Sequence, residues 1–364
     1  MKKIGIVGAG AFGCSIALEL EKKGFEVHLF EKDNDICQEA TKKNHLRHHY
    51  GYHYPRSKKT ALESINARKS FEKMFKECII DGFPAYYAMV RKGSKTSKKD
   101  FLEFCDELGL KYEIVAPDPK IFNVVEIDFC IKTPEPAYDP LILKEIIKKY
   151  LKDTNVKISL SSEITNGKIM SNGKKRLTIR KNNKEYYEDF DIAIFAVYSN
   201  LGKINGWFDF PKKRYRYDLM ELLDVELPIK KRFGAMIIDG DFSTFVPLTK
   251  LGNVRLGHVR EVRIKTEISE GLDVSEWIKK TDISKSDKIM KESIKYFPIL
   301  KEAKVLGSNY IVRIVRANVD STDDRTSEIT DYGNGVYSIL AGKVISCVDI
   351  AKDLSEKIID SLSY

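Results

Sequence analysis

The sequence lacks long apolar runs and paired cysteines. Its longest hydrophobic stretches, such as residues 192–198, are far shorter than the roughly 20 residues that cross a bilayer, so no membrane insertion is expected. Its six cysteines are scattered and form no CxxC pair, which argues against a structural zinc site and a disulfide scaffold. Glycines interrupt the N-terminal MKKIGIVGAG, which therefore reads as mature structure and not as a signal peptide. We expect a cytoplasmic protein with reduced cysteines.

The chain also lacks a concentrated charge of one sign. Lys and Arg number 62 against 53 Asp and Glu, a formal net charge of +9, and the basic residues are spread along the chain. This distribution argues against a nucleic-acid partner and favours an anionic small molecule, a phosphate-bearing cofactor among them. With 364 residues the chain is longer than one usual domain, which predicts two domains that share a cleft. The sequence makes no prediction of oligomeric state.

A βαβ unit opens the chain. Residues 3–8 read as a buried strand, residues 11–23 carry apolar side chains at a helical period, and residues 26–31 read as a second strand that ends in an acid. Between the first strand and the helix lies Gly8-Ala9-Gly10-Ala11-Phe12-Gly13, the GxGxxG fingerprint of dinucleotide binding in its required context. The acid, Glu31, follows at close to the roughly 20 residues expected of a group that binds the adenosine ribose hydroxyls.

Each glycine of the fingerprint has a physical role. Gly8 allows a tight turn, Gly10 lets the backbone approach a pyrophosphate, and Gly13 lets helix and strand pack closely. The pyrophosphate then contacts unpaired N–H groups at the start of the helix. Glu31 repels a 2′-phosphate, which disfavours NADP. The alternative interpretation is a glycine-rich turn without a ligand.

The rest of the chain predicts an α/β fold with two sheets. Helices are expected at residues 59–78 and 139–151, strands at 156–164 and 191–198, and a hairpin around Asn182-Asn183. Alternating patterns in residues 215–265 and 305–316 predict a second, mostly antiparallel sheet. The chain is expected to end with a strand at residues 335–340, a turn at Ala341-Gly342-Lys343 and a helix to residue 359.

The segment HLRHHYGYHYPRS, residues 45–57, holds four of the six histidines. Histidine at this density fits a metal site, a catalytic site or a polar aromatic loop. No Asp, Glu or Cys lies among His45, His48, His49 and His53 to complete a ligand set, so no metal is expected. For His45 and His48 we favour an ordinary polar or helix-end role, because one loop rarely needs four working histidines.

The layout resembles the FAD-dependent oxidoreductases of the D-amino-acid oxidase type, the group that contains glycine and sarcosine oxidases. The resemblance rests on GAGAFG with Glu31, on Thr41 and Asn44, on HHYGYHYPR, on DIAIFAVYSN and on YSILAGKVIS. It implies a Rossmann-like FAD-binding domain (residues 1–80, 139–210 and 330–364) and an antiparallel-sheet substrate domain (81–138 and 211–329). The cofactor-binding residues so implied are Gly8, Gly10, Ala11, Phe12, Gly13, Glu31, Lys32, Thr41, Asn44, Ile164, Ala196, Gly342, Lys343 and Val344.

A second resemblance is carried by His49-Tyr50-Gly51-Tyr52-His53, which is similar to the HxYGxHxF stretch of UDP-galactopyranose mutases. Here Pro55 stands in place of the final Phe, and Lys42-Lys43-Asn44 in place of the preceding Gly-Gly-Asn. This resemblance implies a flavin-dependent sugar mutase as the alternative enzyme. A non-catalytic dinucleotide-binding protein is the alternative outside enzymes.

The first resemblance implies that residues 41–56 lie beside the flavin ring, with His49, Tyr52, His53 and Arg56 in catalytic positions. A neutral histidine there accepts the proton lost from an amine or carbinol, and one histidine is alternatively a covalent flavin tether. The expected reaction is oxidation of a C–N or C–O bond in a small anionic amine, amino acid, hydroxy acid or sugar derivative, with hydride transfer to flavin N5.

An arginine is expected to anchor the anionic group of the substrate. Arg313 and Arg316 are three residues apart on a predicted strand, so they face opposite sides and one of them faces the cleft. We predict Arg316 as the anchor, with Arg325 as a reserve. The alternative for Arg316 is a salt bridge to Asp323 or Asp324. His258 and Arg260 are on the same face of a predicted strand. This face either forms a wall of the substrate site or is an ordinary face of the sheet.

Overall fold

The computed structural model describes residues 1–208, 210–279, 281–319 and 322–362. Within these ranges a six-stranded sheet has the order β19, β20, β12, β1, β2, β8. Five of its strands are parallel, β1 (Lys3–Val7), β2 (Glu26–Phe30), β8 (Lys157–Ser159), β12 (Ile192–Phe195) and β20 (Val336–Leu340), and β19 (Glu328–Asp331) is antiparallel to β20. The central strands are almost wholly apolar because both faces of a parallel sheet are covered.

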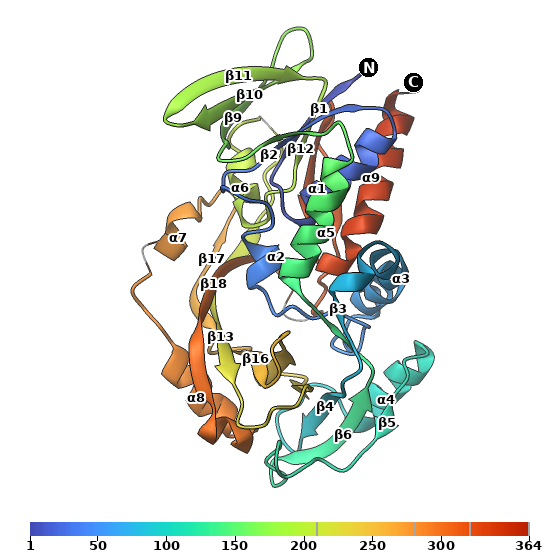
Figure 1. The fold of residues 1–364 in the computed structure, drawn as a ribbon, viewed down its shortest axis with the longest axis vertical. Coiled ribbons are helices and arrows are strands. Elements are labelled where there is room, and N and C mark those ends of the chain that lie inside the picture. The colour runs from blue at the N-terminus through green and yellow to red at the C-terminus, as the bar shows by residue number, and fades with distance from the viewer. Residues whose placement is uncertain (209, 280, 320–321, 363–364) are drawn as a thin grey trace.

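Helices cover one face of this sheet (Figure 1). They are α1 (Ala11–Lys22), α3 (Lys58–Phe75), α5 (Pro140–Lys152) and α9 (Cys347–Leu362), and their apolar sides pack with Ile4, Ile6 and Ile194. The start of α5 follows its sequence signal, because the Asp139 carboxylate accepts hydrogen bonds from the N–H groups of Leu141 and Ile142. The predicted βαβ unit and both predicted helices are confirmed.

A three-stranded meander lies against the other face. It consists of β9 (Glu163–Ile169), β10 (Lys175–Lys181) and β11 (Lys184–Phe190). The predicted hairpin is confirmed, with Asn182 and Asn183 at φ of 51° and 58°. The prediction of one strand over residues 156–164 is wrong: β8 ends at Ser159, Ser161 takes a φ of 50°, and β9 joins the other sheet. Polar and apolar residues alternate in both β8 and β9, so the sequence pattern gives no sign of the bend between the two strands.

The second large sheet has nine strands in the described residues, in the order β17, β13, β16, β15, β14, β4, β6, β5, with β18 also paired to β13. Their bounds are β4 (Ala85–Val90), β5 (Glu113–Ile114), β6 (Ile127–Thr133), β13 (Tyr215–Glu226), β14 (Gly234–Ile238), β15 (Ser243–Pro247), β16 (Asn253–His258), β17 (Arg263–Ser269) and β18 (Lys304–Arg316). Its pairs are antiparallel except β14 with β4, so the predicted second sheet is confirmed.

Shorter elements connect and cover the two sheets. They are the ribbon β3 (Ile79–Ile80) with β7 (Ala137–Tyr138), the helices α2 (Ala40–Lys43), α4 (Lys98–Glu107), α6 (Leu201–Ile204), α7 (Ser275–Lys279) and α8 (Ser286–Ile294), and four 3₁₀ turns in the described chain, Lys76–Cys78, Tyr198–Asn200, Pro298–Glu302 and Val344–Ser346. Helices α8 and α4 bury Ile289 and Phe101 in the two cores of the larger sheet.

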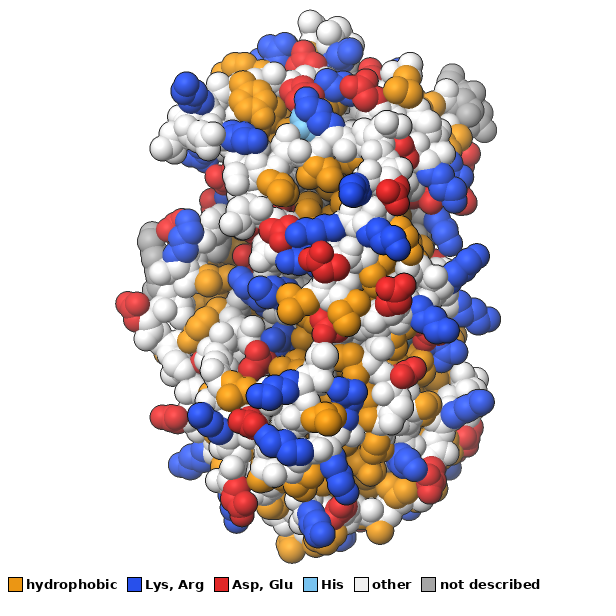
Figure 2. All heavy atoms as spheres, in the orientation of Figure 1, with side chains coloured by type: hydrophobic (Ala, Val, Ile, Leu, Met, Phe, Trp, Pro, Cys, Tyr) orange, Lys and Arg blue, Asp and Glu red, His pale blue; other side chains and the backbone are white. Residues whose placement is uncertain are grey.

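The surface mixes charges of both signs. Figure 2 shows basic and acidic side chains interspersed over the face in view, with apolar side chains between them. In the part of the chain that the structure describes, none of the helices has the length and apolar character needed to cross a membrane.

Candidate active site

A cavity of about 640 Å³ is lined by both large sheets. On one side the lining comes from the parallel sheet and its loops, including the glycine-rich turn between β1 and α1. Strands β14, β15, β16 and β18 form the opposite wall. The lining includes all but one of the predicted cofactor-binding residues: Gly8, Gly10, Ala11, Phe12, Glu31, Lys32, Thr41, Asn44, Ile164, Ala196, Gly342, Lys343 and Val344. Gly13 is absent from the lining because it packs inside the βαβ unit.

The glycine-rich turn between β1 and α1 is shaped for close backbone approach. Gly8 has a φ of 96°, a left-handed conformation that favours glycine. A Cβ on Gly13 would lie 1.8 Å from the carbonyl oxygen of Gly8, so only glycine fits where helix and turn meet. A Cβ on Gly10 would meet only Thr41 Oγ1, at 3.5 Å. Gly10 therefore leaves open space towards the cavity, as a pyrophosphate requires.

Glu31 lies at the end of β2 and is held in place by backbone donors. Its Oε2 accepts a hydrogen bond from the Ala9 N–H at 2.8 Å, and its Oε1 accepts one from the Asp33 N–H at 3.1 Å. Burial raises the pKa of Glu31, while these two hydrogen bonds lower it. Nearby, Thr41 Oγ1 accepts a hydrogen bond from the Ala11 N–H at 3.1 Å. These contacts fix the acid beside the turn, in the place that a ribose-binding acid of this fingerprint takes.

The histidine-rich segment alternates between the cavity and the core. His45, Arg47 and His49 line the cavity, followed by His53 and Tyr54. His48 points the other way: its Nε2 lies 3.1 Å from Glu72 Oε1, and its ring packs on Phe71. The interpretation of His48 as a structural residue agrees with this position. His45, for which an ordinary polar role was favoured, lies in the cavity lining, and Leu46 after it takes a φ of 57°.

Tyr52 lies outside the cavity, although it was predicted to be catalytic. Its hydroxyl donates a hydrogen bond to the Lys111 carbonyl oxygen at 2.5 Å, and its ring packs near Tyr87 in an aromatic core. The side chain is 1% exposed. The chain turns at Gly51, which has a φ of 109°, and Tyr52 after it points into the core while His53 and Tyr54 line the cavity.

The imidazoles in the cavity are kept neutral. Burial, and then the charges of Arg47 and other cations, lower the pKa of His45 to about 3. Burial also lowers the pKa of His49 and of His53 well below the usual range, with Lys343 and Arg47 adding to the effect. The Nδ1 atoms of all three rings are buried without a hydrogen-bond partner in the described chain. Buried polar atoms of this kind need a partner, which a ligand or an ordered water supplies.

Four cationic side chains line the cavity near these imidazoles: Arg47, Arg313, Arg325 and Lys343. Arg47 Nη2 donates a hydrogen bond to Thr244 Oγ1 at 2.7 Å, and Arg313 is paired with Asp218 at 2.8 Å. Arg325 binds Asp323 through Nε at 3.0 Å, while its Nη1 is buried without a partner among the described residues. The sequence analysis did not name Arg47 as a site residue. Its place in the histidine-rich segment, two residues before His49, is the signal that could have identified it.

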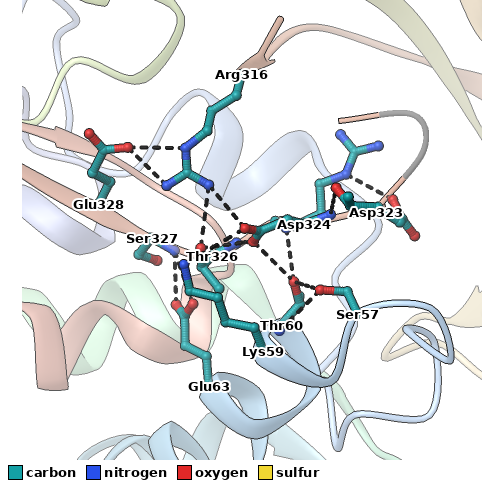
Figure 3. A network of polar contacts seen from close by, with 12 residues as sticks. Ser57, Lys59, Thr60, Glu63, Arg316, Asp323, Asp324, Thr326, Ser327 and Glu328 are labelled. Carbon is teal, nitrogen blue, oxygen red and sulfur yellow. Dashed lines mark hydrogen bonds and ion pairs between the residues drawn. The ribbon is translucent and has the colours of Figure 1, made fainter. Parts of the chain in front are cut away.

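Arg316 lines the cavity, but its guanidinium is engaged in a network (Figure 3). Its Nη2 and Nε bind Glu328 Oε2 at 2.8 and 3.1 Å, and its Nη1 lies 3.5 Å from Asp324 Oδ2. The alternative of a salt bridge to Asp324 is therefore present. Arg56 also lines the cavity and is paired with Asp239 through Nε and Nη2. Both predicted residues have carboxylate partners.

The same network fixes the chain that carries Arg325. The Thr60 hydroxyl in α3 accepts a hydrogen bond from the Arg325 N–H at 2.9 Å, and the Glu63 carboxylate accepts one from the Ser327 N–H at 3.0 Å (Figure 3). Arg325 is thus positioned through its backbone. Of the other two expected wall residues, His258 lines the cavity and Arg260 does not, since it is exposed and paired with Glu261.

Residues 3–309 match the family model described as "DAO: FAD dependent oxidoreductase". The chain belongs to this family. It is accordingly an FAD-dependent oxidoreductase of the D-amino-acid oxidase type, and the cavity geometry fits the cofactor. The Gly10 opening, the turn N–H groups and Glu31 suit a dinucleotide, and the cavity extends from them to the unpartnered imidazoles. In the described residues, no group of three or more His, Cys, Asp or Glu side chains is arranged to hold a metal.

Other comparisons agree with the family. The "FAD-dependent monooxygenase FPY4" of Fusarium mangiferae is 23% identical over 94% of this chain and 87% of its own length. The "FAD-dependent monooxygenase kojA" of Aspergillus flavus is 38% identical, but the match spans only 32% of this chain and 28% of that relative.

Two solved structures show the same fold. Glycine oxidase from Geobacillus kaustophilus superposes with a TM-score of 0.73 at 11% identity, covering 98% of this chain and 95% of that one. L-alpha-glycerophosphate oxidase from Mycoplasma pneumoniae, solved with FAD bound, gives a TM-score of 0.74 at 17% identity and covers 97% and 94%. At these identities the likeness concerns the fold alone.

Proposed function

We propose that this FAD-dependent oxidoreductase oxidises a C–N or C–O bond of a small anionic amine, amino acid, hydroxy acid or sugar derivative. The observation that carries the proposal is the cationic end of the cavity, where Arg325 Nη1 and three imidazole Nδ1 atoms are buried without partners among the described residues. Arg325 Nη1 is a buried donor that needs an acceptor, and a carboxylate or phosphate is the acceptor that an arginine favours.

Arg325 is the proposed anchor of the anionic group. Arg316 was the first choice from the sequence, but its carboxylate partners Glu328 and Asp324 already neutralise it. Arg325 has one carboxylate, Asp323, on Nε, and its Nη1 remains available. Arginine suits this role because its planar donors match a carboxylate or phosphate.

The neutral imidazoles of His49 and His53 are proposed to bind and orient the substrate. A neutral ring offers one donor and one acceptor, which fits a hydroxyl or amine next to an anionic group. When bound, FAD supplies the hydride acceptor at N5 of its ring. In this proposal residues 1–80, 139–210 and 330–364 hold FAD, and residues 81–138 and 211–329 hold the substrate. We also propose a cytoplasmic location, which the six free, buried cysteines support.

The test is anaerobic mixing of the FAD-loaded protein with matched pairs of compounds. Hydroxy acids, amino acids and phosphorylated polyols are compared with their uncharged amides or alcohols, and loss of the oxidised-flavin absorbance is followed. We expect bleaching by at least one anionic member and at least tenfold slower bleaching by its uncharged partner. Equal bleaching by both members would refute the anionic substrate, and activity that appears only after dithionite reduction with a nucleotide sugar would favour a mutase.

A further inference from the structure

Lys343 occupies a fixed position next to Arg325. It follows β20 and immediately precedes the 3₁₀ turn Val344–Ser346. The neighbouring Gly342 donates a backbone hydrogen bond to Ser327 Oγ at 3.0 Å. A Cβ on Gly342 would lie 2.2 Å from the Arg325 carbonyl oxygen, so the two backbones are in direct contact. The lysine and the proposed substrate anchor therefore enter the cavity from adjoining segments.

The amine of Lys343 has no close counter-ion. Its Nζ lies 4.3 Å from the centre of the Tyr54 ring, and no carboxylate of the described chain is within ion-pair distance of it. Among its neighbours, the charge of Arg325 lowers the pKa of Lys343 most, Asp323 and Glu63 raise it, and Arg47 lowers it by a smaller amount. Burial, followed by the charge of Arg325, lowers the pKa of Lys343 to about 7. An ammonium in this partly buried position with no ion-pair partner among the described residues is costly, which favours the neutral amine.

The imidazoles around it are unsuited to accept a proton. His49 and His53 share the cavity with Arg47 and Lys343, and burial with these cations lowers the pKa of both rings well below the usual range. A general base works best when its pKa is near the working pH. These histidines are therefore neutral but weak bases, and the lysine has the better match.

We infer that Lys343 accepts the proton that the substrate's hydroxyl or amine loses on oxidation. The inference rests on the proposed function and changes the base from histidine to lysine. The substrate's O–H or N–H bond breaks and its proton passes to Nζ. The electron pair left behind forms the new C=O or C=N bond as the C–H hydride leaves to the FAD. The substrate's anionic group, held by Arg325, then provides the counter-ion that the protein does not supply to the ammonium.

The first arm of the test needs no turnover. The FAD-loaded protein is titrated with acetate and with inorganic phosphate at pH 8 by calorimetry, in two buffers of different ionisation enthalpy. Because the anion stabilises the ammonium form, we expect binding to take up as much as one proton. Lys343→Arg, which keeps the charge but is always protonated, is expected to bind either anion without proton uptake. Binding by the wild type with no proton uptake would overturn the inference and leave the proposed function standing.

The second arm measures the anaerobic rate of flavin reduction against pH. For the wild type we expect the second-order rate constant to rise to a plateau with a midpoint near 7. Lys343→Met and Lys343→Arg are each expected to lose at least about 10²-fold and to lack the rise. Ethylamine is expected to restore part of the rate to Lys343→Ala. Lys69→Met, which changes an exposed lysine of α3 outside the cavity lining, is the control.

Two results separate this role from contact with the flavin edge. A group that only compensates flavin charge would be replaced by arginine with little loss, so a wild-type rate in Lys343→Arg would overturn the inference. A rise with pH that persists in Lys343→Met would do the same. If no anion binds and no candidate bleaches the flavin, the proposed function fails and the inference fails with it.

Discussion

Substitutions in the glycine-rich turn allow the effect on protein stability to be distinguished from the effect on FAD binding. In Gly10→Ala the new Cβ meets only Thr41 Oγ1, at an ordinary contact distance of 3.5 Å. Gly10 has φ of −73° and ψ of −178°, which any residue adopts. Alanine makes the unfolded chain less flexible, which raises the free energy of unfolding by about 0.4–1 kcal/mol. Alanine is a poorer helix N-cap than glycine, and this lowers the free energy of unfolding again. The free energy of unfolding of the apoprotein is therefore expected to change by less than about 1 kcal/mol.

The same methyl group occupies the space through which the pyrophosphate must approach. We expect Gly10→Ala to weaken FAD binding by at least tenfold, which corresponds to about 1.4 kcal/mol. The matched variant is Gly13→Ala, whose Cβ would lie 1.8 Å from the Gly8 carbonyl oxygen. Because this contact is with backbone, the apoprotein itself is expected to lose about 1–3 kcal/mol or more.

The assays are urea unfolding of the apoproteins and titration of FAD fluorescence. Gly10→Ala is expected to keep the wild-type unfolding curve and lose FAD affinity, while Gly13→Ala loses both. If Gly10→Ala bound FAD as tightly as the wild type, the cofactor would not lie against this turn, and the assignment of the cavity would be refuted.

Three further predictions concern the cationic end of the cavity and its surroundings. Because the pKa of Lys343 is lowered in the folded state, its charge destabilises the fold fully below about pH 7, and this penalty shrinks from pH 7 until it vanishes above the unfolded value near 10.5. Lys343→Met should therefore raise the free energy of unfolding of the apoprotein by up to about 5 kcal/mol at pH 6 and by little at pH 11, measured in urea. Tyr52→Phe should lose about 1 kcal/mol of stability with the hydrogen bond to Lys111, and its flavin-reduction rate should stay within about twofold, since a large rate loss would place Tyr52 in the site. Arg325→Lys should weaken acetate binding about tenfold and Arg316→Lys should not, and the reverse order in calorimetry would make Arg316 the anchor.

Much of the fold was predictable because its signals are local. The turn at Gly8 to Gly13, the Asp139 cap of α5 and the paired asparagines at 182 and 183 each act within a few residues. The break at Ser161 was not predictable in this way, because the two pieces alternate alike and only their partners in different sheets distinguish them.

The sequence by itself determined the chemistry available: a dinucleotide turn with an acid after it, and a segment dense in histidine. Only the tertiary structure decided which side chains share the cavity. It brought Arg47, Arg325 and Lys343 together from segments far apart in the chain, and it paired Arg316 with Glu328. The physical reason is that the charge state of a buried group depends on desolvation and on neighbours in space, which residue order does not specify.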